Sequence, residues 1–219
     1  MGRHPDSPNG HNGKKALNGN GNGHASNGDG HHNGYPEAPP MDPGRMYFYT
    51  DGCLIGKYGS WSVVGVKYDP EAEKWKSVFS ASDEDVPAKD STQMELHAIR
   101  VAIRTALDAY PGTRACVRTD HQGLKKAIGG YLRSYSSNFR GADEEVRTNK
   151  VRQDTRKRYK SYDYADEYDN LFNMLDQIGQ HAAHHEQQFS IEWLPRESDS
   201  WIRRADRDAR SANPTSRMP

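Results

Sequence analysis

The sequence predicts an α/β domain in which helices pack on a mixed β-sheet. Three observations support this class: three strand-like segments follow one another directly, strand-like and helix-like segments then alternate, and a Pro-containing turn joins the second and third strands. Strands that form a meander pair antiparallel, whereas strands joined by helices can pair parallel. We therefore expect a sheet that contains both kinds of pair.

The elements can be placed in chain order from short aromatic or β-branched runs and from helical periodicity. The first strand is expected over residues 46–56, and the next two over 60–68 and 74–81, with Asp69-Pro70-Glu71 as the turn between them. The remaining elements are a helix over 91–110, a strand over 114–119, helices over 121–132 and 164–183, a strand over 189–194 and a helix over 201–212. Residues 134–160 fit neither pattern.

The first 45 residues differ in composition from the rest of the chain. They hold 10 of the 20 glycines and 5 of the 10 histidines, and they contain no Val, Ile, Phe, Trp or Cys. Such a segment cannot bury enough apolar surface to offset the entropy of ordering it. We interpret residues 1–45 as a disordered tail and its irregularly spaced histidines as low-complexity sequence rather than a metal site. The domain is then expected over 46–212, with a disordered C-terminus over 213–219.

The global charge gives no indication of a partner, because 30 Lys and Arg balance 30 Asp and Glu. No apolar run approaches the about 20 residues that cross a bilayer, and the N-terminus lacks the apolar core of a secretory signal. We therefore expect a soluble protein in the cytoplasm or elsewhere inside the cell, with no membrane partner. Cys53 and Cys116 suggest neither a disulfide framework nor a metal cluster and are interpreted as packing residues.

Two acidic residues occupy positions where a structural residue would be apolar. Asp51 interrupts the first strand, and although Asp-Gly often marks a hairpin turn, Leu54-Ile55 continues the strand pattern beyond it. Glu95 lies on the same helical stripe as Ile99 and Ala102, which is the face expected to be buried. A buried carboxylate needs a partner or a metal ion. A position near the helix start, where the helix dipole favours acids, is the alternative for Glu95.

Two further acids are ambiguous when taken singly. Asp120 ends the fourth strand and could simply cap the following helix, although ligand-binding side chains also gather at strand ends. Asp206 lies among arginines in the last helix, where most acids are solvated ion-pair partners. Together with Asp51 and Glu95, however, they form a set of four carboxylates from separate segments. Such a set can surround two hard divalent cations that act on a phosphodiester.

Four segments, in this order, resemble motifs of the ribonuclease H family, in its type 1-like form. They are Thr50-Asp51-Gly52, Met94-Glu95-Leu96, Thr119-Asp120-His121-Gln122 and Ala205-Asp206. The resemblance covers about residues 46–212. It implies a five-stranded mixed sheet, three strands antiparallel and the rest parallel, flanked by helices. It also implies two Mg²⁺ or Mn²⁺ ions as cofactors, held by Asp51, Glu95, Asp120 and Asp206 as the catalytic residues, with Asp51 bridging both.

The activity implied by this resemblance is hydrolysis of the RNA strand of RNA–DNA hybrids, leaving 5′-phosphate and 3′-hydroxyl ends. The sequence departs from the family near its C-terminal end, where a His about ten residues before the last Asp is absent. Glu197 or Arg196 could partly compensate for it, and Asp199 is the alternative to Asp206 as fourth ligand. Two other hypotheses stay open: a DNA nuclease or resolvase, and a non-catalytic nucleic-acid-binding module. Protein partners stay unknown from the sequence.

A basic segment over residues 123–160 offers a surface for such a substrate. It contains eleven Lys and Arg against four acids, a net charge of +7, with tyrosines interleaved. Basic and aromatic side chains together suit a phosphate backbone and exposed bases. The alternative is that the basic residues pair with the acidic segment 161–180. The candidate nucleic-acid contacts are Lys125, Lys126, Arg152, Arg156 and Arg158.

Overall fold

The computed structural model describes residues 37–85, 87–133, 142–160, 164–185 and 189–213. The chain divides into two units, Met1–Asn33 and Gly34–Pro219, and all of the described residues belong to the second. The predicted N-terminal tail up to residue 36 and the predicted C-terminal tail from residue 214 lie outside them. Among the described residues, no helix is long and apolar enough to cross a membrane.

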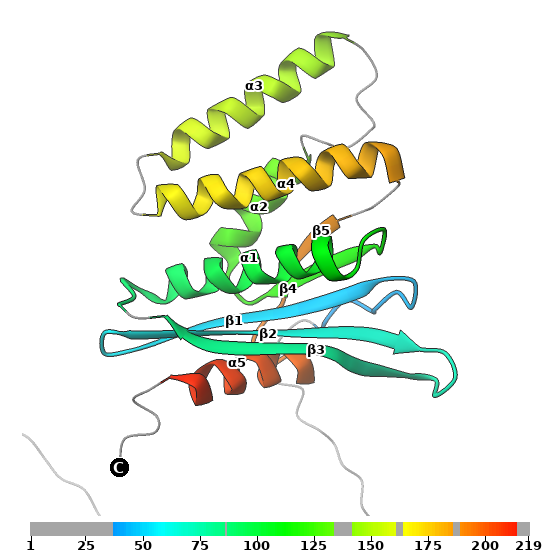
Figure 1. The fold of residues 1–219 in the computed structure, drawn as a ribbon, viewed down its shortest axis with the longest axis vertical. Coiled ribbons are helices and arrows are strands. Elements are labelled where there is room, and N and C mark those ends of the chain that lie inside the picture. Colours follow the sequence, from blue (N-terminus) through cyan, green and yellow to red (C-terminus); the bar gives the residue numbers. More distant parts are fainter. Residues whose placement is uncertain (1–36, 86, 134–141, 161–163, 186–188, 214–219) are drawn as a thin grey trace, which may run out of the picture. The chain divides into compact units, whose positions relative to one another are not determined.

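A single five-stranded sheet forms the centre of the described unit, with the strand order β3-β2-β1-β4-β5 (Figure 1). The strands are β1 (Met46–Ile55), β2 (Tyr58–Asp69), β3 (Lys74–Asp85), β4 (Ala115–Thr119) and β5 (Phe189–Trp193). The pairs β1–β2 and β2–β3 are antiparallel, whereas β1–β4 and β4–β5 are parallel. The predicted mixed sheet is confirmed. Asp51 lies within a strand as predicted, because it pairs with Ser62 inside the β1–β2 ladder.

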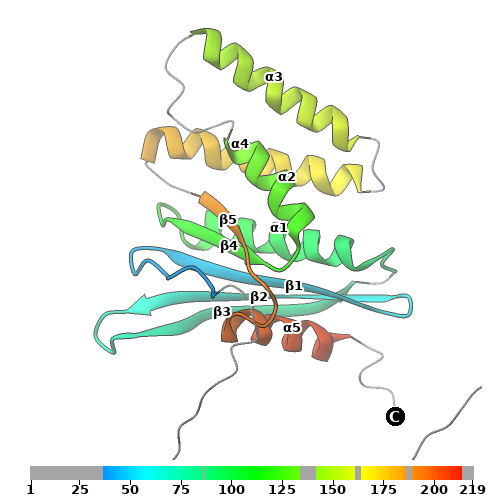
Figure 2. The ribbon, with the colours of Figure 1, turned by 180° about the vertical axis from the view of Figure 1, so that it is seen from behind.

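Helices cover both faces of this sheet, as the views from opposite sides in Figures 1 and 2 show. They are α1 (Ser91–Ala109), α2 (Gln122–Arg133), α3 (Ala142–Tyr159), α4 (Ala165–His185) and α5 (Ser200–Ala212). Helix α5 packs against β1 and β2 on one face, and α1 packs against the same strands on the other, with α4 beyond α1. The four helices that the sequence predicted are present, with ends that differ by at most two residues.

Alternation along β1 separates two apolar clusters, one for each face of the sheet. Met46 and Phe48 belong to the larger cluster, which includes the buried side of α1, and Tyr47 and Tyr49 belong to the smaller one beneath α5. Successive side chains of a strand point to opposite faces, so an aromatic-rich strand with both faces covered can supply both clusters. The central position of β1 follows from this burial on both sides.

Two elements differ from the sequence-based expectation. Strand β3 continues to Asp85, four residues beyond its predicted end, since Ser82-Asp83-Glu84-Asp85 pairs with β2 at the sheet edge. These four residues show no alternation of apolar side chains, so the sequence gives no strand signal there. Helix α3 occupies much of the segment 134–160, whose sequence fits neither the strand nor the helix pattern. Its main contacts are with α4 and α2, and a helix without a continuous apolar stripe gives no periodic signal in the sequence.

A buried arginine ties the start of the domain to its last strand. Arg118 in β4 is fully buried, its Nε donates to Glu192 at 2.9 Å, and its Nη2 donates to the carbonyl of Pro39 at 2.8 Å. The guanidinium also lies 4.5 Å from the centre of the Tyr47 ring. Ala38 packs against the same cluster. Part of the segment that the sequence analysis assigned to the tail therefore contacts the domain, through a backbone carbonyl that composition does not reveal.

We predict that Gly52→Ala strongly destabilises the fold. A Cβ at Gly52 would lie 2.2 Å from the backbone nitrogen of Glu95, so α1 would have to move away from β1. We expect the free energy of unfolding in urea to fall by about 2–3 kcal/mol or more. Gly123→Ala in α2 is the matched control, because its nearest neighbour is the side chain of His121 at 3.1 Å; it should change stability by less than about 1 kcal/mol. Equal losses in the two variants would contradict this prediction.

Candidate metal centre

Two neighbouring parallel strands position two of the predicted acidic residues. In the β1–β4 ladder Thr50 pairs with Thr119, and Asp51 and Asp120 are the residues that directly follow them. The register therefore brings both carboxylates to the same level, where β4 ends and β1 continues. Trp193 at the end of β5 donates its indole N–H to the carbonyl of Asp120 at 2.9 Å, which holds the backbone at that point.

Helix α1 supplies the third acidic residue, Glu95. The side chain of Asp90 caps this helix by accepting a hydrogen bond from the N–H of Gln93 at 3.0 Å. Glu95 is only 3% exposed, so its predicted place on the buried stripe is confirmed. Because Gly52 has no side chain, the first turns of α1 come close enough for Glu95 to reach the strand ends.

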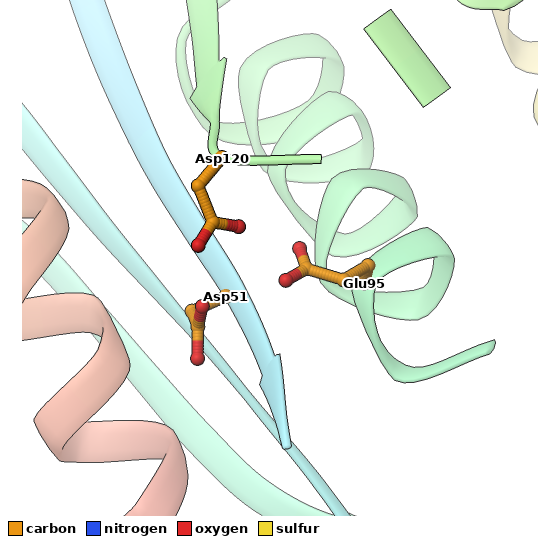
Figure 3. Close-up of side chains that lie close together, drawn as sticks. All are labelled: Asp51, Glu95 and Asp120. Carbon is orange, nitrogen blue, oxygen red and sulfur yellow. The ribbon is translucent and has the colours of Figure 1, made fainter. Parts of the chain in front are cut away.

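These three carboxylates gather in one cluster, which Figure 3 shows. Asp51, Glu95 and Asp120 each offer an oxygen, and these oxygens all lie within 4.8 Å of one another. Asp51 is 1% exposed, whereas Asp120 is partly exposed at the rim of the cluster. Three carboxylates from β1, α1 and the end of β4 thus converge although 69 positions separate the first from the last in the sequence.

Mutual repulsion and burial disfavour the ionised form of this cluster. Burial, followed by the charge of Asp120, raises the pKa of Asp51 to about 7. Burial and the charges of Asp51 and Asp120 raise the pKa of Glu95 well above its ordinary value, although the backbone N–H of Gly52 opposes this. Raised pKa values of neighbouring buried acids are typical of functional sites.

An arginine that follows β5 is the main counter-charge of this cluster. The Nε of Arg196 donates to Asp120 Oδ2 at 2.7 Å, and its Nη2 donates to Asp51 Oδ1 at 3.3 Å. Its Nη1 forms an ion pair with Asp206 Oδ1 at 3.1 Å. From the sequence, Arg196 is expected only to compensate partly for an absent His. Its place could have been anticipated from β5, because the carboxyl ends of the parallel strands β4 and β5 meet at one edge.

The donor set suits a hard divalent cation. All three side chains of the cluster supply carboxylate oxygens, which Mg²⁺ and Mn²⁺ prefer. The second oxygen of Asp51, Oδ2, is buried and has no hydrogen-bond partner among the described residues. Burial of a carboxylate oxygen without a partner costs free energy of folding unless a cation binds to it. The residues present therefore fit a metal ion.

The other acids considered for this site lie in different surroundings. Asp206 in α5 is outside the three-carboxylate cluster, but Arg196 links it to Asp51, and Arg210 forms a second ion pair with it at 2.9 Å. Asp199, the alternative fourth ligand, instead caps α5 by accepting from the N–H of Trp201. Glu197 is exposed in the turn before α5.

The basic residues predicted to contact nucleic acid also differ in their surroundings. Lys126 and Arg158 are exposed, and Lys125 and Arg152 are partly exposed. Arg156 instead pairs with Asp176 of α4 at 2.6 Å and donates to Tyr131 of α2 at 3.0 Å. For Arg156 the geometry matches the alternative stated above, in which the basic segment pairs with the acidic helix that follows it.

We predict that Glu95→Gln stabilises the metal-free protein at neutral and alkaline pH. The folded state binds protons more tightly than the unfolded state, because its acidic pKa values are raised. The stability that these acids contribute is full below their ordinary pKa values and is lost as the pH rises through their raised values, which for Asp51 is about 7. The neutral side chain of Gln removes one charge from the cluster, so we expect a gain of about 1–3 kcal/mol at pH 8 and little change at pH 4.

Urea unfolding in EDTA at several pH values measures this effect. Glu71→Gln, which changes an exposed acid in the β2–β3 turn, is the control and should leave the pH profile unaltered. A loss of stability in Glu95→Gln at pH 8 would contradict the repulsion that we describe.

Comparison with known proteins supports the fold but supplies no close relative. No protein-family model matches the chain, and no curated protein sequence matches it. Among solved structures, the protease-reverse transcriptase of prototype foamy virus aligns with a TM-score of 0.55 and 16% identity, covering 81% of this chain and 22% of that one. A foamy viral protease-reverse transcriptase in complex with dsDNA aligns with a TM-score of 0.54 and 14% identity, covering 81% and 99%.

An RNase H1 from the halophilic archaeon Halobacterium salinarum NRC-1 aligns with a TM-score of 0.44 and 21% identity, covering 77% of this chain and 97% of that one. At these sequence identities, the structural similarity shows the fold alone. The chain spans about a fifth of the length of the prototype foamy virus protein. The strand order β3-β2-β1-β4-β5, with its antiparallel and parallel halves and helices on both faces, gives this chain a ribonuclease H-like fold.

Proposed function

We propose that the protein is a metal-dependent endonuclease that hydrolyses the RNA strand of RNA–DNA hybrids, leaving 5′-phosphate and 3′-hydroxyl ends. The observation that carries this proposal is the cluster of Asp51, Glu95 and Asp120, with its raised pKa values and the unpaired Oδ2 of Asp51. A structural role would not require three acids to share one buried cluster. A role in binding divalent cations explains it, because these ions prefer oxygen ligands.

In this proposal the side chains of the cluster hold the cations and orient the substrate phosphate. Asp51 is the central ligand, since its Oδ1 contacts Arg196 while its Oδ2 has no partner among the described residues. Glu95 and Asp120 complete the cluster, and Asp206 is the candidate fourth ligand. When bound, two Mg²⁺ or Mn²⁺ ions would activate a water molecule and stabilise the leaving oxygen. Glu197, exposed in the turn before α5, is the candidate helper on the substrate side.

The exposed part of the basic segment offers a surface for the sugar–phosphate backbone. Lys126 in α2 and Lys157 and Arg158 in α3 are exposed, and they lie on the two helices that follow the strand end at Asp120. Contacts of this kind bind phosphates without reading base sequence. Lys125 and Arg152, which are partly exposed, would add to this surface. Arg156 would act indirectly, since its ion pair with Asp176 holds α3 against α4.

A non-catalytic nucleic-acid-binding module on the same fold is the second candidate function. One observation favours it: the guanidinium of Arg196 already bonds Asp51 and Asp120 and pairs with Asp206, so the acids have a cation without any metal. A protein of this kind would bind hybrids in a salt-dependent manner and cleave nothing with any divalent metal. Cleavage assays therefore separate the two candidates.

We predict that Asp51→Asn abolishes cleavage. A labelled RNA–DNA hybrid incubated with Mg²⁺ or Mn²⁺ should yield products with 5′-phosphates in the original protein, and EDTA should prevent this. Loss of the central ligand should lower the rate by more than the about 10–100-fold that the loss of an outer partner costs. Asp108→Asn, an exposed position at the end of α1, is the control and should cleave normally. Products that persist in EDTA or in Asp51→Asn would contradict the proposal, and cleavage of duplex DNA instead of the hybrid would favour a DNA nuclease.

We predict that the double variant Lys126→Gln, Lys157→Gln weakens hybrid binding without affecting stability. Each lost phosphate contact should reduce the slope of log K against log salt by about 0.9 for a duplex. Binding of a fluorescent hybrid, measured by anisotropy in EDTA at several salt concentrations, tests this. Arg156→Gln is the comparison, because it should lower the melting temperature through its lost contacts with α2 and α4. An unchanged salt slope in the double variant would exclude these two lysines from the interface.

A further inference from the structure

The acidic site has two places for positive charge, and an arginine fills one of them. The first place is the cluster of Asp51, Glu95 and Asp120, where the oxygens lie within 4.8 Å of one another and Asp51 Oδ2 has no partner in the described part of the chain. The second place lies among Asp51, Asp120 and Asp206, and there the three nitrogens of the Arg196 guanidinium each contact a different carboxylate.

The guanidinium and a second divalent ion compete for this place among the three acids. It donates to Asp51 Oδ1 and Asp120 Oδ2, and a metal bound to the same oxygens would compete for their lone pairs and repel the positive charge. Deprotonation does not remove this competition. The guanidinium of an arginine keeps its positive charge in proteins. Arg196 must therefore move before a second ion can occupy this place.

The local structure allows such a movement. Arg196 lies in the turn between β5 and α5, in which Ser198 donates from its N–H and its hydroxyl to the carbonyl of Pro195 at 3.0 and 2.7 Å. The Arg196 side chain is 38% exposed, unlike Asp51, which is 1% exposed. A rotation of this side chain toward solvent would leave the hydrogen bonds of the turn intact.

We propose that Arg196 acts as a built-in substitute for one of the two cations. In the free protein the site then binds one divalent ion readily, at the cluster of Asp51, Glu95 and Asp120. A second ion enters only when Arg196 withdraws from Asp51, Asp120 and Asp206. This inference rests on the proposed metal centre and concerns how many ions that centre holds.

Titration with Mn²⁺, with the free ion counted by electron paramagnetic resonance, tests this proposal without any substrate. The original protein should bind one ion, and a second should bind at least about 10-fold more weakly. Arg196→Gln should bind two ions, with the second site strengthened by about 10-fold or more. Arg210→Gln is the matched control: it also removes an ion pair with Asp206, but it leaves the bonds to Asp51 and Asp120 in place. Its second site should stay within about threefold of the original.

The possible outcomes separate this inference from the proposed function. Two ions bound equally well with and without Arg196 would overturn the inference and leave the metal centre intact. No ion bound by any of the three proteins would overturn both. If Arg196→Gln is poorly folded, crystals of the original protein soaked at low and high Mn²⁺ give the same answer. A second Mn²⁺ peak with Arg196 still bonded to Asp51 and Asp120 would refute the competition.

Discussion

The repulsion among three carboxylates in one cluster is the constraint on which the rest of the site depends. Asp51 and Glu95 are almost fully buried, so neither water nor distance weakens their interaction with Asp120. Only protons or cations can relieve it. The fold nevertheless brings these acids together through the β1–β4 register and the close approach of α1 at Gly52. Such an arrangement lowers the stability of the metal-free protein, which is typical of a site that binds a charged partner.

Two arginines near this site differ in burial, and this difference decides whether another cation can replace them. Arg118 is completely buried, and its nitrogens bond Glu192, Tyr49 and the carbonyl of Pro39, so its removal would leave several buried groups without partners. Arg196 contacts the buried Asp51 and the partly exposed Asp120 and Asp206, but it keeps more than a third of its side chain in solvent. Its contacts can therefore be replaced by those of another cation at modest cost.

Much of the fold and half of the site could be predicted because the relevant signals are local. The place of Asp51 inside a strand and the buried position of Glu95 both follow from periodicity. The contacts of Arg118 could not be predicted, because they join residues that are distant in the sequence, and an arginine in a list of basic residues looks the same whether it is buried or exposed. Helix α3 escaped prediction for the related reason that it packs on another helix and carries no continuous apolar stripe.

The balance of charges gives a physical reason why Arg196 lies among the carboxylates of this site. Asp51, Glu95, Asp120 and Asp206 carry four negative charges when ionised, and Arg196 and Arg210 supply two positive charges. The negative charge that remains is balanced by the charge of one divalent ion. A second divalent ion would leave an excess of positive charge unless Arg196 withdrew and a substrate phosphate arrived, in which case the charges again cancel. Under the proposed nuclease function, exchange of Arg196 for a second ion is therefore most favourable when a phosphodiester is bound, which would couple completion of the site to the presence of substrate.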